Sequence, residues 1–76
     1  MLKAYILIET TVGTGGNIAK LLKPVHEVRF ADRVTGPYDV IVLVETVDLP
    51  ALHGFLSDRV HPLPGVQKTV TCVVVS

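Results

Sequence analysis

Val34-Thr35-Gly36-Pro37-Tyr38-Asp39 joins two long apolar segments and predicts the turn of a β-hairpin. The pair Gly36-Pro37 is typical of a turn, because proline has a fixed φ and no N–H, and glycine adopts backbone conformations that a Cβ forbids. Tyr38 and Asp39 then open the outgoing strand. Aspartate is disfavoured in strands unless it accepts hydrogen bonds at an end or serves a partner. Asp39 therefore either ties down the turn or binds a ligand, and its residue chemistry alone favours the first reading.

Four segments show the alternation of side chains that is typical of strands: 2–9, 25–35, 38–46 and 66–75. The first and third are apolar on both faces, so both of their faces need cover. The second and fourth keep a polar face. In the second segment, strict alternation groups Ala31 and Arg33 with Glu27 and Arg29 on a wet face.

Two further segments carry apolar residues at helical spacing. Ile18, Leu21 and Leu22 predict a short helix over about 15–23, which ends there because Pro24 disfavours a helical Lys23. Asp48 is a natural N-cap for a second helix. The apolar stripe of that helix consists of Leu49, Leu52, Phe55, Leu56 and Val60, and Pro62, Pro64 and Gly65 end it.

The order strand, helix, strand, strand, helix, strand is a split βαβ pattern. It predicts an α+β, ferredoxin-like βαββαβ fold: a four-stranded antiparallel sheet with two helices on one face. The first and third strands then lie in the centre, in agreement with their two apolar faces. Nothing in the chain remains to cover the other sheet face. We therefore predict a dimer in which a second subunit's sheet buries the side of Tyr5, Leu7, Ile41 and Leu43, or the opposite side.

Length and composition agree with a small domain that assembles. A chain of 76 residues forms one domain, over 1–76, and buries only about 60 to 65% of its unfolded surface, so its core is marginal. The hydrophobic content of 49% and the mean hydropathy of +0.51 are high for a chain that must also cover its outside. Cys72, the single cysteine, is expected to be a buried small hydrophobe.

The composition also argues against two classes of partner. Seven basic and seven acidic residues, without long blocks of either sign, lack the electrostatic footprint of a nucleic-acid binder. No apolar run approaches the roughly 18 to 20 residues of a membrane span, and no signal peptide is evident. We expect no direct nucleic-acid contact, no membrane contact and a cytoplasmic location.

The residues indicate no catalytic centre. His26, His53 and His61 lack the spacing of metal ligands, and no Ser-His-Asp set or acid and base pair is evident. The loop Gly13-Thr14-Gly15-Gly16 lacks the lysine and hydroxyl of a nucleotide-binding loop, which favours a flexible connector. We expect no enzyme, no metal and no cofactor.

Polar groups gather instead near the turn and in the first half of the last strand. Asp39 can accept hydrogen bonds from an α-ammonium group. Backbone N–H groups near Gly36 and threonine hydroxyls can donate to a carboxylate. The predicted ligand-binding residues for a small zwitterion are Gly36, Tyr38, Asp39, Thr69 and Thr71.

Two motifs carry a family resemblance over essentially the whole chain: Thr35-Gly36-Pro37-Tyr38-Asp39-Val40 before an apolar strand, and Leu63-Pro64-Gly65-Val66 before Thr69 and Thr71. They resemble the effector-binding (RAM) domain of the Lrp/AsnC family of feast/famine regulators. The resemblance implies an amino-acid-sensing module whose sheets pair into a dimeric α/β barrel. It further implies that the dimers join into rings, with effectors bound between dimers near the G-x-Y-D turn. Gly36, Tyr38 and Asp39 match that turn, and Thr69 and Thr71 match polar positions of the last strand.

The chain departs from the family pattern in two ways. It begins at the first strand, without the N-terminal helix-turn-helix of the usual regulators, and so resembles their stand-alone form. The segment Leu22-Lys23-Pro24-Val25-His26 stands where the family commonly has a Pro-Gly-Val turn, and the glycine-rich loop before the first helix is unusual.

The leading hypothesis is a non-enzymatic, oligomeric amino-acid-binding module that modulates full-length Lrp/AsnC transcriptional regulators by mixed assembly. An ACT-like amino-acid-binding domain is an alternative with the same topology. A small monooxygenase of the dimeric α/β-barrel type is another, and it requires a polar cavity between the helices and the sheet. A structural assembly partner without a ligand is a third.

Overall fold

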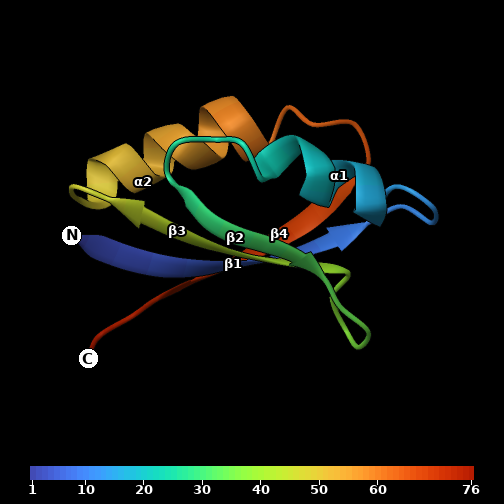
Figure 1. Cartoon of the computed structure of the whole chain (residues 1–76), viewed down its shortest axis with the longest axis horizontal. Helices are drawn as coiled ribbons and strands as arrows, with labels where there is room; N and C mark the ends of the chain where they lie inside the picture. Colours follow the sequence, from blue (N-terminus) through green and yellow to red (C-terminus); the bar gives the residue numbers. More distant parts are fainter.

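In a computed structural model that describes all residues from Met1 to Ser76, the chain forms a layer of strands covered on one side by helices (Figure 1). The elements are β1 (Leu2–Thr10), α1 (Gly15–Leu22), β2 (Val28–Arg33), β3 (Val40–Thr46), α2 (Leu49–Phe55), the π-helical turn η1 (Leu56–Val60) and β4 (Val66–Val73). All neighbouring strands pair antiparallel, in the spatial order β2-β3-β1-β4. The predicted fold, with the first and third strands in the centre, is confirmed.

The core lies between the sheet and the two helices. Fifteen buried apolar residues form it, and the sheet contributes Ala4, Ile6 and Ile8 from β1 and Val40, Val42 and Val44 from β3. The helices add Ile18, Leu22, Leu52 and Phe55 among others. Burial of each large aliphatic side chain stabilises the fold by about 1.5–3 kcal/mol. The apolar stripes of both helices therefore hold them on the same face of the sheet.

The opposite sheet face has no cover within the chain. Its centre carries seven uncharged side chains that we call the open sheet face: Tyr5, Leu7, Phe30, Ile41, Leu43, Val70 and Cys72. The charged residues Lys3, Glu9, Asp32, Glu45 and Lys68 share this side of the sheet and surround them. The Tyr5 and Phe30 rings lie 6.5 Å apart, and the two side chains are 40% and 37% exposed. Cys72 is exposed rather than buried, because it pairs with Tyr5 on this face.

A β-bulge in β2 decides which of its side chains face the helices. Val28 pairs with Val44 and Phe30 pairs with Leu43, so Arg29 is an extra residue on this strand. One extra residue reverses the alternation beyond it. Ala31 is therefore fully buried beneath the helices, and Arg33 lies on the same side. The prediction that Ala31 occupies a wet face is wrong, whereas Arg33 is exposed at the edge of the helix side.

The second helix begins as predicted. The Asp48 side chain accepts a hydrogen bond of 2.9 Å from the Ala51 N–H, which is the geometry of an N-cap. The helix widens into η1, and the chain then turns at Gly65 into β4. No helix in the protein has the length and apolar character needed to cross a bilayer.

Candidate functional site

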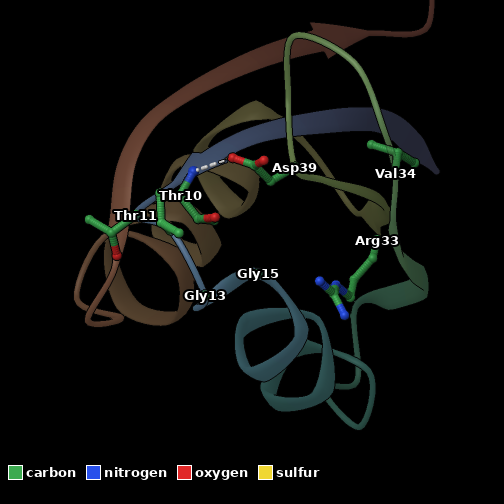
Figure 2. A pocket seen from close by; sticks show the side chains of 8 residues that line it. Thr10, Thr11, Gly13, Gly15, Arg33, Val34 and Asp39 are labelled. Carbon is green, nitrogen blue, oxygen red and sulfur yellow. Dashed lines mark hydrogen bonds between the residues drawn. The ribbon is translucent and has the colours of Figure 1, made fainter.

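A small cavity lies at the end of the molecule away from both termini, where the loop after β1 and the β2–β3 turn meet (Figures 1 and 2). Its volume is about 230 Å³. Eight residues from four segments line it: Thr10, Thr11, Val12, Gly13, Gly15, Arg33, Val34 and Asp39. This size suits a metabolite smaller than the drug-sized ligands that occupy about 300–1,000 Å³.

Asp39 forms one wall of the cavity and is held by both its backbone and its side chain. Its N–H donates to the Ile8 carbonyl over 2.9 Å, and its carbonyl accepts from the Val34 N–H over 2.9 Å. Its Oδ2 accepts a hydrogen bond of 2.8 Å from the Thr10 N–H (Figure 2). Asp39 therefore ties the end of β1 to the start of β3, while Oδ1 makes no hydrogen bond within the protein.

Arg33 forms the facing wall. Its side chain crosses the first turn of α1 above Gly16, where a Cβ on that glycine would lie only 3.3 Å from Arg33 Nη1. The only ion pair of the protein joins Arg29 to Glu45, so the Arg33 guanidinium has no carboxylate within 4 Å. Figure 2 shows the Asp39 carboxylate directed toward Thr10 and the Arg33 side chain directed toward the start of α1, and both residues line the cavity. A cation and an anion thus face one cavity without contact.

The glycine-rich loop forms the floor of the cavity. Gly13 has a φ of 87°, a conformation that favours glycine. The Thr14 hydroxyl donates to the Thr11 carbonyl over 2.8 Å and so does not cap the helix, and the first turn of α1 has no acidic residue. The N–H groups of a first helical turn have no partner within the helix. This loop, predicted to be a flexible connector, therefore brings free backbone donors to the cavity.

The turn before β4 holds this loop in place. The Thr11 N–H donates to the Gly65 carbonyl over 2.9 Å. Gly65 has a φ of 96°, and a Cβ there would lie 2.6 Å from Thr14 Oγ1. Only glycine permits this approach. The L-P-G-V motif thus positions the loop that lines the cavity.

Only one of the five predicted ligand-binding residues lines the cavity, and that residue is Asp39. Gly36 is exposed in the turn with a φ of 138°, and Tyr38 is half-buried beside it. Thr69 and Thr71 pair with Ile8 and Ile6 on β4, so β1 separates them from Asp39.

The surroundings of the two threonines differ from the cavity. Thr69 Oγ1 lies 3.4 Å from His61 Nε2, and Thr71 is exposed. Within one chain, Thr69 and Thr71 therefore do not converge with Asp39. Their role in ligand binding, like that of Gly36 and Tyr38, stays a prediction.

The sequence did not predict the other seven lining residues, of which Thr10 and Arg33 contact or face Asp39 across the cavity. The predicted topology contained a usable signal, because the ends of the first and second strands and the start of the third meet at one edge of an antiparallel sheet. Thr10, Arg33 and Asp39 occupy those positions. Strict alternation did not predict that Arg33 faces α1. The bulge that reverses the side of Arg33 cannot be recognised in the pattern of polar and apolar residues. Nowhere do three His, Cys, Asp or Glu side chains gather as metal ligands.

Comparison with known proteins places the chain in a family. Residues 3–76 match the model of the Lrp/AsnC ligand binding domain. The HTH-type transcriptional regulator FL11 of Pyrococcus abyssi is 34% identical over 71 residues, which are 93% of this chain and 46% of that regulator. The chain thus spans about half the length of that relative.

Two solved structures of similar length share the fold. Hypothetical protein PHS023 from Pyrococcus horikoshii is 36% identical with a TM-score of 0.90, over 100% of this chain and 92% of that one. TTHA0845 from Thermus thermophilus is 26% identical with a TM-score of 0.94, over 100% and 95%. With its family motifs at the turn and at Gly65, the chain belongs to the Lrp/AsnC ligand binding domain family.

Proposed function

We propose that the protein binds a free α-amino acid in the cavity between Asp39 and Arg33. The observation that carries this proposal is the pair of opposite charges that face one small cavity without an ion pair between them. Asp39 Oδ1 would accept hydrogen bonds from the α-ammonium group. The Arg33 guanidinium would donate to the α-carboxylate, and the first turn of α1 would add backbone donors.

The family and its fold support an amino-acid ligand. A transcriptional regulator from Neisseria meningitidis, 22% identical to this chain with a TM-score of 0.88, has been solved as a complex with L-Met. The match covers 99% of this chain and 50% of that one. The ligand of that regulator is a zwitterion of the kind that the cavity of this protein suits.

The open sheet face supports a homodimer in this proposal. Its side chains are mostly apolar, and an apolar face of this kind on a small domain marks a protein interface. If two copies packed these faces together, the second apolar face of each central strand would be buried in the dimer. The dimer would be of the α/β-barrel type.

The positions of the predicted residues support higher assembly in this proposal. Because β1 separates Thr69 and Thr71 from Asp39, these threonines could reach the same ligand only from a neighbouring subunit. A ligand bound between dimers would stabilise a ring by its differential affinity for that assembly. The non-enzymatic, cytoplasmic module would then modulate full-length regulators through mixed assembly.

The interior favours this function over a monooxygenase. A dimeric α/β-barrel enzyme needs a cavity with polar groups between its helices and its sheet. In this protein the fifteen apolar residues of the core fill that space. The polar groups lie at the end of the sheet instead.

Native mass spectrometry with each of the twenty amino acids tests the proposal. At least one amino acid should add its mass to the protein, and its 2-oxo acid, which lacks the ammonium group, should not. Arg33→Gln should weaken binding roughly tenfold or more, because it removes a charge-assisted hydrogen bond to the carboxylate.

Arg59→Gln is the matched control, because Arg59 is an exposed arginine of η1 that does not line the cavity. Its binding should equal that of the wild type. Absence of binding by all twenty amino acids, or unchanged affinity in Arg33→Gln, would contradict the proposal.

A further inference from the structure

A second groove adjoins the cavity at Arg33 and Val34. These two residues line both spaces. The groove runs between α1 and β2, and its other lining residues are Gly16, Ala19, Lys20, Lys23 and Asp32. A ligand whose backbone occupies the cavity would therefore direct its side chain over Arg33 into this groove.

The groove is basic. Lys20, Lys23 and Arg33 contribute three positive charges and Asp32 one negative charge, which leaves a local net charge of +2. The whole protein has a formal net charge of zero, so positive charge is concentrated here. None of the three cations has a carboxylate partner within 4 Å, because the only ion pair is Arg29–Glu45.

The lysines belong to the helix that borders the groove. Lys20 and Lys23 are three residues apart and share one helix face. Side chains of an α-helix lean toward its N-terminus, so both project toward the end where Arg33 crosses Gly16. At a rise of about 1.5 Å per residue, Lys20 lies roughly 6 Å along the axis from Gly16. That distance is within reach of a ligand side chain.

The helix dipole of α1 explains the position of the lysines near its C-terminus but not the position of Arg33 near its N-terminus. A lysine in the last turn interacts favourably with the helix dipole, as Lys20 does in α1. Arg33 lies against the first turn, where the dipole favours anions and opposes a cation. A bound anion between Arg33 and the helix start would remove this conflict. The placement of Arg33 is thus a second observation that points to a negatively charged ligand.

We infer that the ligand is an α-amino acid with an acidic side chain, of the aspartate and glutamate class. This inference rests on the proposed function. Asp39 receives the ammonium group, Arg33 and the start of α1 receive the α-carboxylate, and Lys20 and Lys23 receive the side-chain carboxylate. The two carboxylates of the ligand then balance the excess positive charge of the groove.

Calorimetric titration of the full chain with L-Glu, L-Asp, L-Gln, L-Asn and L-Leu tests the inference. L-Glu or L-Asp should bind about five- to tenfold more tightly than its own amide, and raising the salt from about 0.02 M to about 0.15 M should reduce that preference. The double variant Lys20→Gln/Lys23→Gln should lose the preference and keep the affinity for the amides. Glutamine and lysine have similar helix propensities, so α1 should persist, and circular dichroism verifies this.

Lys68→Gln is the control, because Lys68 is an exposed lysine on β4, away from the groove. It should retain the preference for the acid. Equal affinity for acids and amides in the wild type, or an unchanged preference in the double variant, would overturn this inference and leave the proposed function standing. Absence of binding by any amino acid would overturn both.

Discussion

Asp39 uses one carboxylate oxygen in the fold and leaves the other for the proposed ligand. Its Oδ2 is used by the Thr10 N–H, and its Oδ1 has no partner in the protein. The two readings of Asp39 from sequence, a residue that ties down the chain and a residue that binds, therefore concern different oxygen atoms.

Two substitutions of Asp39 separate these roles. Asp39→Asn keeps an oxygen that accepts from the Thr10 N–H but removes the charge, so we expect amino-acid affinity to fall with little change in stability. Asp39→Ala also leaves the Thr10 N–H without its partner, which should lower the free energy of unfolding by about 1–2 kcal/mol. Chemical denaturation at a fixed protein concentration, together with calorimetric titration, measures both quantities. Equal loss of stability in the two variants would contradict this division.

Gly65 is the residue on which the loop before α1 depends most directly. Gly65→Ala places a side chain at a φ of 96° and within 2.6 Å of Thr14 Oγ1, so we expect a loss of about 2 kcal/mol or more in the free energy of unfolding. Gly54→Ala is the control, because a Cβ there meets nothing within 4 Å. As Gly54 is in α2, its replacement should stabilise the protein by up to about 1 kcal/mol. Thermal and chemical unfolding measure both changes, and similar effects at the two glycines would refute the argument.

Among the elements, the regular strands and helices were predictable from the sequence, and the bulge in β2 was not. The alternation in β1 and β3, the helices and the Asp48 cap each have a local cause, and the structure confirms them. Of the predicted helical stripes, Leu21 and Leu49 are exposed and the other members are buried. The bulge in β2 has no such local cause. Its extra residue, Arg29, reaches Glu45 on the neighbouring strand over 2.8 Å, a contact that appears only once the sheet has formed.

The candidate site was predictable to the same extent. Asp39 follows a recognisable turn, whereas Arg33 lines the cavity only because the bulge turned it and Gly16 left room for it. Strict alternation places such a residue on the wrong side of the sheet. A site that depends on an irregular strand therefore requires the structure.

The first turn of α1 offers a test of the contact between Arg33 and Gly16. Gly16→Ala adds a Cβ that would lie 3.3 Å from Arg33 Nη1, so the flexible arginine side chain must shift by a few tenths of an ångström. We expect amino-acid binding to weaken several-fold, while the free energy of unfolding changes by less than about 0.5 kcal/mol. Gly54→Ala serves again as the control, with unchanged binding. Unaltered affinity in Gly16→Ala would show that the position of Arg33 does not matter to the ligand.

At the scale of the whole molecule, the proposed homodimer depends on the open sheet face. Sedimentation velocity should show twice the 8.2 kDa mass of one chain, or a multiple of that dimer. Leu43→Glu introduces a charge in the middle of the open sheet face, opposite Tyr5, and should yield a folded monomer.

Leu21→Glu is the matched control, because Leu21 is an exposed residue of α1, on the helix side of the molecule. The assembly of this variant should equal that of the wild type. A wild-type protein that remains monomeric at all concentrations would refute the homodimer and the barrel-type assembly together.

The exposed thiol of Cys72 gives the protein an intrinsic reporter of the proposed assembly. It lies on the open sheet face of a separate chain and would be shielded when two such faces meet. Because the chain has no other cysteine, the alkylation kinetics of the native protein would follow a single site. The labelling half-time would then lengthen as the protein concentration rises, and any effector that drives assembly would lengthen it further without a probe having to be introduced.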